Sequence, residues 1–272
     1  MRKRATLSLS GSGHLLIYQL GACRTLLSHG IAIRHVVGAS GGAIAAAVVA
    51  AQLPLEDYAQ AFIQQKGGGM KLLEEFWDNR TTDLRGGGVD AKNTDIVLHI
   101  ATTRCSDVAS KVFSFPTLTD REKIFDCIRA SCLIPPTFHP LDILSTPSPY
   151  PDHHGIPIDD PIVGMEFYVD GGISTPAPMI DLSEFEADEE DTRIIISPVA
   201  GTSQYTARIS PPLASSFWPH IETKYDLGLQ LSWSNLKALR AATGNVSSTE
   251  LHDWYMRGQD DANRFLESSV ES

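Results

Sequence analysis

One serine of this sequence stands in a setting that suits a nucleophile. Ser40 is flanked by Gly38, Gly41 and Gly42 in the pattern G-x-S-x-G. Small flanking residues let a serine occupy a sharp, strained turn between a strand and a helix, where its hydroxyl can meet a substrate. The N-terminus of the helix that follows would favour negative charge developing beside that hydroxyl. The pattern therefore indicates acyl transfer, with Ser40 as the candidate nucleophile.

A second candidate element is the glycine-rich run Ser10–Gly13. Backbone N–H groups of Gly11, Ser12 and Gly13 could point together at a developing oxyanion. The plainer interpretation is a turn that needs glycine for its backbone angles. A dinucleotide-binding fingerprint is excluded, because its third glycine would fall at Leu16.

The third element is Asp170, which is followed by Gly171 and Gly172. It comes directly after Phe167–Val169, a predicted strand, and an aspartate at the end of a strand can reach into a crevice at the edge of a sheet. An ordinary Asp-Gly turn is the simpler alternative. Together the three elements supply an oxyanion loop, a nucleophile and a base, the minimum for acyl transfer. Because an ordinary aspartate is a weak base, we expect burial to raise the pKa of Asp170 and Ser40 to donate a hydrogen bond to it.

Two other kinds of site are weaker hypotheses. His220 or His252 could complete a serine triad, in which case replacing that histidine would abolish activity; we expect either to be replaceable by alanine with substantial activity left. A metal site could be imagined in the loop that holds Asp152, His153, His154, Asp159 and Asp160. Their spacing fits no helical or finger pattern, so we expect a solvated loop and no metal there.

The elements that would position these residues alternate between strand and helix. Ala5–Leu9 and Ile33–Val37 are short and apolar and predict strands, while Leu15–Leu27 and Gly41–Ala51 predict helices. A β-α-β-α order predicts an α/β fold with a parallel sheet covered by helices. We expect one domain over residues 1–272, with a core at about 5–200 and a largely helical part at about 220–267.

Further elements follow from the same patterns. Helices are expected at Leu55–Gln64 and Arg121–Ser131, and strands at Ile96–Ala101, Val108–Phe115 and Arg193–Ser197. Turns are expected at Gly67–Gly69 and Gly86–Gly88, a long proline-rich irregular loop at 136–161, and a solvated acidic loop at Glu184–Asp191.

Composition narrows the class of partner. The net charge of −11 argues against nucleic acids, which need clustered cations, and against simple adhesion to anionic lipid. Four cysteines without a CxxC pair suggest free thiols in a reducing compartment. No apolar run approaches the roughly 18–20 residues that span a bilayer, and serine and glycine interrupt the run that a signal peptide would need. Phe217 and Trp218 are the better candidates for contact with lipid, whereas Trp233 and Trp254 are expected to pack in the fold.

The order of the three motifs resembles the patatin-like phospholipases. The segments Ile17–Gly21, Arg129–Pro135 and Tyr168–Ile173 resemble the animal subgroup of adipose triglyceride lipase and adiponutrin, and the likeness runs from about residue 5 to 267. The resemblance implies a patatin-type three-layer α/β/α sandwich. It also implies a Ser-Asp dyad that cleaves acyl esters of phospholipids or neutral glycerides without metal or cofactor.

Carried over by position, Ser40 would be the nucleophile and Asp170 the general base, with N–H groups of Gly11, Ser12 and Gly13 as the oxyanion hole. The chain departs from the family pattern at Leu16, where a glycine is usual. The loop at 136–165 is longer than its equivalent and could act as a lid, and we expect no counterpart of the long C-terminal extension that adipose triglyceride lipase uses to attach to droplets.

Three functions are compatible with these observations: a lipid acyl hydrolase, an acyltransferase at the same site, and a non-catalytic lipid-binding relative. We expect an intracellular protein that meets its lipid substrate at a membrane or droplet surface, with any protein activator unidentified.

Overall fold

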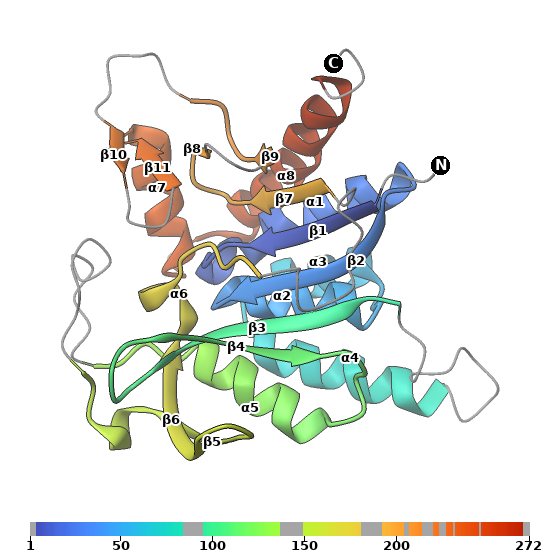
Figure 1. Cartoon of the computed structure of the whole chain (residues 1–272). Coiled ribbons are helices and arrows are strands. Elements are labelled where there is room, and N and C mark those ends of the chain that lie inside the picture. The colour runs from blue at the N-terminus through green and yellow to red at the C-terminus, as the bar shows by residue number, and fades with distance from the viewer. Residues whose placement is uncertain are drawn as a thin grey trace.

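The computed structural model describes residues 4–83, 95–136, 149–180, 192–203, 207–213, 220–222, 227–230, 232–244 and 246–268 (Figure 1). The strands are β1 (Arg4–Leu9), β2 (Ala32–Ala39), β3 (Val97–Arg104), β4 (Ser110–Phe115), β5 (Ile156–Asp160), β6 (Gly164–Asp170), β7 (Thr192–Ile196), β8 (Gly201–Ser203), β9 (Ala207–Ile209), β10 (His220–Glu222) and β11 (Leu227–Gln230). The α-helices are α1 (Leu16–Ser28), α2 (Gly41–Ala50), α3 (Leu55–Gln65), α4 (Gly69–Asp83), α5 (Arg121–Ser131), α6 (Gly171–Ser174), α7 (Trp233–Ala242) and α8 (Ser248–Ser268), with 3-10 turns η1 (Gly13–Leu15) and η4 (Asp152–His154).

The expected α/β class is confirmed, with a mixed and mainly parallel central sheet. Its order is β5-β6-β3-β2-β1-β7-β9, with β4 beside β3, and the path from β3 to β9 is parallel throughout. Helices pack on both sides of this sheet, as in a three-layer sandwich. The parallel strands end at one common edge, and α6 and α7 lie at that edge (Figure 1).

The first β-α-β-α unit forms where the sequence predicts it, because its strands and helices are mainly apolar and are buried on nearly every side. Leu7 and Leu9 of β1 are fully buried, and so is almost the whole of α2. Strands buried on both faces are typical of parallel sheets covered by helices. The many alanines of α2 let it pack closely against its neighbours, and this holds the helix that follows Ser40 firmly in the core.

The C-terminal helix α8 packs against α1 along much of its length. Glycine makes this approach possible: a Cβ on Gly21 would lie 2.2 Å from the Tyr255 carbonyl oxygen, and one on Gly258 would lie 2.0 Å from that of Tyr18. The hydroxyl of Tyr18 also donates a 2.7 Å hydrogen bond to Asp261. Helix α8 therefore belongs to the same core as α1.

Several expected elements differ in the structure. Helix α4 was not predicted, although its apolar residues recur at helical spacing and it buries Leu72 and Leu73. Gly67 and Gly68 form the expected turn, but Gly69 already begins this helix. The proline-rich region contains the strand β5, and the short strands β10 and β11 precede α7 in the part expected to be helical.

Several predictions fall outside the described residues. They concern the turn at Gly86–Gly88, the acidic loop at Glu184–Asp191, residues 137–148 of the loop at 136–165, and the side chains of Phe217 and Trp218. Among the helices that are described, none combines the length and the apolar character needed to cross a bilayer.

Candidate active site

The register of β1 and β2 brings the glycine-rich loop alongside the candidate nucleophile. Leu9, the last residue of β1, pairs with Gly38 on β2. Two residues further along, Gly11 therefore lies beside Ser40, and a Cβ placed on Gly11 would be 3.8 Å from the Ser40 Cβ. Both Gly11 and Ser40 remain partly exposed, so a substrate can approach the point where the two segments meet.

The register of β3 brings the candidate base to the same edge. Ala39 pairs with Ala101 in the parallel direction, and the next residue of β3, Thr102, pairs with Asp170 in the antiparallel direction. Strand β6 thus runs antiparallel to β3, and its last residue, Asp170, lies near the edge of the sheet where β2 and β3 also end. Asp170 reaches the edge of the sheet as its position predicted, although its strand runs opposite to its neighbour.

The turn at Ser40 is strained and closely packed. Ser40 has φ 53° and ψ −128°, a conformation that costs a non-glycine residue about 1–3 kcal/mol. A Cβ on Gly38 would lie 2.1 Å from the Gly42 carbonyl oxygen, and one on Gly41 would lie 2.3 Å from the Gly13 carbonyl oxygen. A Cβ on Gly42 would lie 2.4 Å from a β1 carbonyl oxygen. Close backbone contact therefore explains each glycine of the motif.

Ser131 connects the two halves of the site. The backbone N–H of Ser40 donates a 2.8 Å hydrogen bond to Ser131 Oγ, and the Ser131 hydroxyl donates a 2.7 Å hydrogen bond to the Ala101 carbonyl. A Cβ on Gly171, the residue after Asp170, would lie 3.2 Å from the same Oγ. Ser131 is fully buried, and it ties the strained turn at Ser40 to the end of β3.

Asp170 is buried and its backbone is held on both sides. Its N–H donates to the Leu133 carbonyl at 2.9 Å, and the Thr103 hydroxyl donates to its carbonyl at 2.7 Å. Its carboxylate accepts hydrogen bonds from the side chain of Ser40 and, at 2.7 Å, from the Gly172 N–H. Burial raises the pKa of Asp170 from 3.8 to about 6, against the opposing effect of these two hydrogen bonds. The carboxyl group is therefore a better proton acceptor than an ordinary aspartate.

One backbone N–H group of the glycine-rich loop that was expected to bind an oxyanion already has a hydrogen-bond acceptor. The N–H of Gly11 donates a 2.8 Å hydrogen bond to the Pro176 carbonyl, which takes it out of the expected oxyanion hole. Gln19 braces the loop from α1: its amide donates to the Ser10 carbonyl at 2.8 Å and its oxygen accepts from the Ser12 hydroxyl at 3.1 Å. Sequence reasoning gave Gln19 no role, although it stands in one of the segments that carry the family resemblance.

Leu16 lies away from the site. It is buried at the start of α1, and its Cδ2 would be 3.3 Å from a Cβ on Gly69. Its side chain thus packs into the core beneath the loop. In the loop itself Gly13 has φ 50°, and a Cβ there would be 2.1 Å from the Ala242 carbonyl oxygen at the end of α7. The backbone at residue 13 is therefore set by its contact with α7.

The residues of the alternative sites lie elsewhere in the structure or, for the His220 side chain, outside the described residues. His252 is exposed on α8, and the side chain of His220 lies outside the described residues. Asp160 is buried, with a 2.7 Å ion pair to Lys111 and a 3.0 Å hydrogen bond from Tyr168, so it anchors the β5–β6 hairpin. Among the residues that are described, no cluster of histidine, cysteine or acidic side chains could hold a metal ion.

The geometry suits nucleophilic acyl transfer. The Ser40 hydroxyl, the buried carboxylate of Asp170 and the N-terminus of the buried helix α2 meet at one partly exposed point. Such an arrangement can take the proton of a serine and stabilise a developing oxyanion without a metal.

Comparison with known proteins identifies one family profile and several distant relatives. The profile of the patatin-like phospholipase family matches residues 7–85. The chain is 28% identical over 277 residues to human 1-acylglycerol-3-phosphate O-acyltransferase PNPLA3, covering 96% of this chain and 50% of that protein. It is 25% identical over 284 residues to human omega-hydroxyceramide transacylase, covering 96% of this chain and 45% of that protein. The chain thus spans about half the length of these curated relatives.

Among solved structures, VipD from Legionella pneumophila is similar over 98% of this chain and 67% of that chain, with a TM-score of 0.47 and 13% identity.

Proposed function

Because the chain belongs, by distant homology, to the patatin-like phospholipase family, we propose that it cleaves fatty-acyl esters of glycerolipids through an acyl-Ser40 intermediate. The observation that supports this most strongly is the hydrogen bond between Ser40 and the buried carboxylate of Asp170 at the strained turn. The strained backbone gives a structural serine no added stability. In a nucleophile the same turn exposes the hydroxyl to substrate and places it beside a base.

In the first step the Ser40 oxygen attacks the ester carbonyl carbon while its proton passes to Asp170. The raised pKa of Asp170 makes this transfer easier than it would be to an ordinary aspartate. The Gly172 N–H, which donates to the same carboxylate, keeps the group oriented toward Ser40 throughout. The tetrahedral intermediate then collapses, and the leaving alcohol takes the proton back from Asp170.

The oxyanion of that intermediate needs N–H donors next to Ser40. We assign them to Ser12 and Gly13 together with the N–H groups of Gly41 and Gly42, the first two residues of α2. Gly11 shapes the loop instead, because its own N–H is bound to Pro176. The contact of Gly13 with α7 and of Ser12 with Gln19 holds these donors in place before substrate binds.

The second step decides between two activities. If water attacks the acyl-Ser40 ester, with Asp170 again accepting a proton, the products are a fatty acid and free enzyme. If an alcohol such as a lysophospholipid or a glyceride attacks, the enzyme is an acyltransferase. The second activity is a serious candidate, because the relatives named above are an acyltransferase and a transacylase. In either case we propose a lipid substrate met at a membrane or droplet surface.

Product analysis tests both. Wild-type protein, Ser40→Ala and Asp170→Ala are incubated with triacylglycerol, diacylglycerol and phosphatidylcholine, each with and without added monoacylglycerol or 1-acylglycerol-3-phosphate. We expect the wild type to release free fatty acid, and Ser40→Ala and Asp170→Ala to release none. His252→Ala, which changes an exposed residue, should release as much as the wild type. Products that appear only with an added acceptor would identify an acyltransferase. Equal activity of the wild type and Ser40→Ala would refute the proposed function.

A further inference from the structure

Helix α7 turns an apolar face toward solvent. Trp233, Leu236 and Leu239 are 69%, 52% and 60% exposed, although Trp233 was expected to pack in the fold. The opposite face of the helix is also apolar, because Ala238 and Ala241 are buried. A helix on the surface of a soluble protein normally presents polar residues outward. A cluster of large exposed side chains on one helix is typical of an interaction surface.

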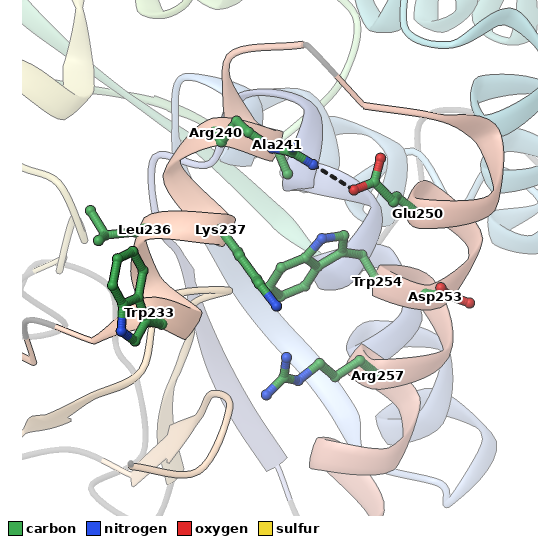
Figure 2. A pocket seen from close by; sticks show the side chains of 9 residues that line it. All are labelled: Trp233, Leu236, Lys237, Arg240, Ala241, Glu250, Asp253, Trp254 and Arg257. Atoms are coloured by element: carbon green, nitrogen blue, oxygen red, sulfur yellow. Dashed lines mark hydrogen bonds and ion pairs between the residues drawn. The ribbon is translucent and has the colours of Figure 1, made fainter.

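A cation-lined groove runs beside this face, between α7 and α8. It has a volume of about 550 Å³, and Figure 2 shows Lys237, Trp254 and Arg257 facing the space between the two helices. The Arg257 guanidinium lies 5.3 Å from the centre of the Trp254 ring. Arg240, which also lines the groove, is already neutralised by a 2.7 Å ion pair with Glu250.

The other two cations of the groove are available for a ligand. Within the part of the chain that the structure describes, no carboxylate forms an ion pair with Lys237 or Arg257. Asp253 also lines the groove, so three cations (Lys237, Arg240 and Arg257) and two carboxylates (Glu250 and Asp253) leave its lining with a net charge of +1. An anion held between two cations and an aromatic ring would satisfy this arrangement.

The position of α7 relates this surface to the candidate active site. Ala242, at the end of α7, contacts Gly13 of the glycine-rich loop, and its carbonyl lies 3.3 Å from Nδ1 of His14. Figure 1 shows α7 at the edge of the sheet where the parallel strands end, which is also the edge that carries Ser40. A lipid surface that touched α7 would therefore lie next to the site.

We propose that α7 and the α7–α8 groove form the surface by which this protein docks on a phospholipid bilayer. Trp233, Leu236 and Leu239 enter the boundary between headgroups and acyl chains, and Lys237 and Arg257 bind the phosphate of one lipid. Tryptophan beside lysine or arginine is the combination that amphipathic helices use at this boundary. The inference rests on the proposed function, because an enzyme for lipid esters must meet its substrate at such a surface.

The charge of the groove favours a phospholipid bilayer over a second copy of this chain as its partner. A symmetric dimer through this groove would bring the cations of one copy close to those of the other. A phosphodiester headgroup instead supplies negative charge that balances the net positive charge of the groove lining. The net charge of the chain repels anionic lipid. The cations of the groove reduce this repulsion, because they lie where the protein would contact the membrane.

Flotation with vesicles tests the proposal. Wild-type protein is mixed with vesicles of phosphatidylcholine, alone or with phosphatidylglycerol, and the bound fraction gives a partition constant. Lys237→Gln/Arg257→Gln should remove the gain from phosphatidylglycerol, a loss of about fivefold per cation. Trp233→Ser should weaken binding to both vesicles by roughly tenfold or more. Matched controls are Arg34→Gln/Lys71→Gln, which removes the same charge from exposed residues elsewhere, and Ile162→Ser, at a site that is 81% exposed.

Each variant is also assayed on a short-chain, water-soluble ester, and its thermal unfolding is measured. We expect groove variants to keep the wild-type rate and unfolding temperature. Equal vesicle binding by the wild type and the groove variants would overturn the inference. The surface would then be a candidate for binding a protein partner. Binding of inorganic phosphate that depends on Lys237 and Arg257, with no binding of the wild type to either vesicle, would also overturn it, in favour of a soluble ligand. If no ester is cleaved but the groove variants still lose vesicle binding, the proposed function fails and the docking surface stands.

Discussion

Replacing Asp170 by asparagine should stabilise the protein while abolishing its activity. Burial raises the pKa of Asp170 from 3.8 to about 6. At pH 8 the folded protein therefore holds a carboxylate whose charged form is disfavoured by about 3 kcal/mol relative to the unfolded chain. Asparagine has nearly the same shape and keeps an oxygen that can accept the Gly172 N–H, but it carries no charge. We expect Asp170→Asn to raise the free energy of unfolding at pH 8 by up to about 3 kcal/mol.

The sign of this effect changes predictably with pH. Between about pH 4 and 6 the folded protein binds the proton of Asp170 more tightly than the unfolded chain, so the wild type loses stability as pH rises through that window. Below about pH 4 the carboxyl is protonated in both states and the advantage of Asp170→Asn should vanish. Urea unfolding of both proteins from pH 4 to 8 measures the difference, with Asp159→Asn, at an exposed residue, as the control. An Asp170→Asn protein that is less stable than the wild type at pH 8 would refute the claim that this carboxylate is strained for function.

Three further predictions follow from the same structure. Ser131→Ala removes the acceptor for the Ser40 N–H, so kcat on a soluble ester should fall by about tenfold or more with little change in KM; an effect no larger than that of Ser28→Ala would contradict this positioning role. The kcat/KM of the wild type should rise with an apparent pKa near 6 and then level off, because only the carboxylate form of Asp170 accepts a proton; a midpoint near about 4 in the pH profile would count against it as the base. Burial lowers the pKa of His99 from 6.5 to about 3. The free energy of unfolding should therefore decline by up to about 1.4 kcal/mol per pH unit below about pH 6.5, and His99→Gln should reduce that slope; equal slopes would show that His99 does not resist protonation.

The sequence predicts the parts of the fold that depend on local pattern. The first β-α-β-α unit could be predicted because its strands are short and apolar and its helices have helical spacing. Strand β5 could not, because prolines and acidic residues surround it, and its pairing with β6 and the ion pair of Asp160 with Lys111 are contacts that the local pattern does not reveal. The exposure of Trp233 could not be predicted either, because the aromatic composition of a helix does not say which face is covered.

The sequence predicts the candidate catalytic residues, but it does not predict the residues that hold them in position. Ser40 and Asp170 were found from motifs, and strand register explains how they meet. The contributions of Ser131 and Gln19 come from contacts between residues far apart in the sequence, which single motifs do not reveal. The hydrogen bond of Gly11 with Pro176 has the same origin, and it narrows the set of oxyanion donors.

The central claim, that Ser40 is an activated nucleophile, is tested most directly by intact-protein mass spectrometry after treatment with a fluorophosphonate. The folded wild type should gain a single adduct that maps to Ser40, Asp170→Asn should react far more slowly, and Ser40→Ala should gain none. A folded wild-type protein that gains no adduct, or an adduct that maps to another residue, would contradict the account.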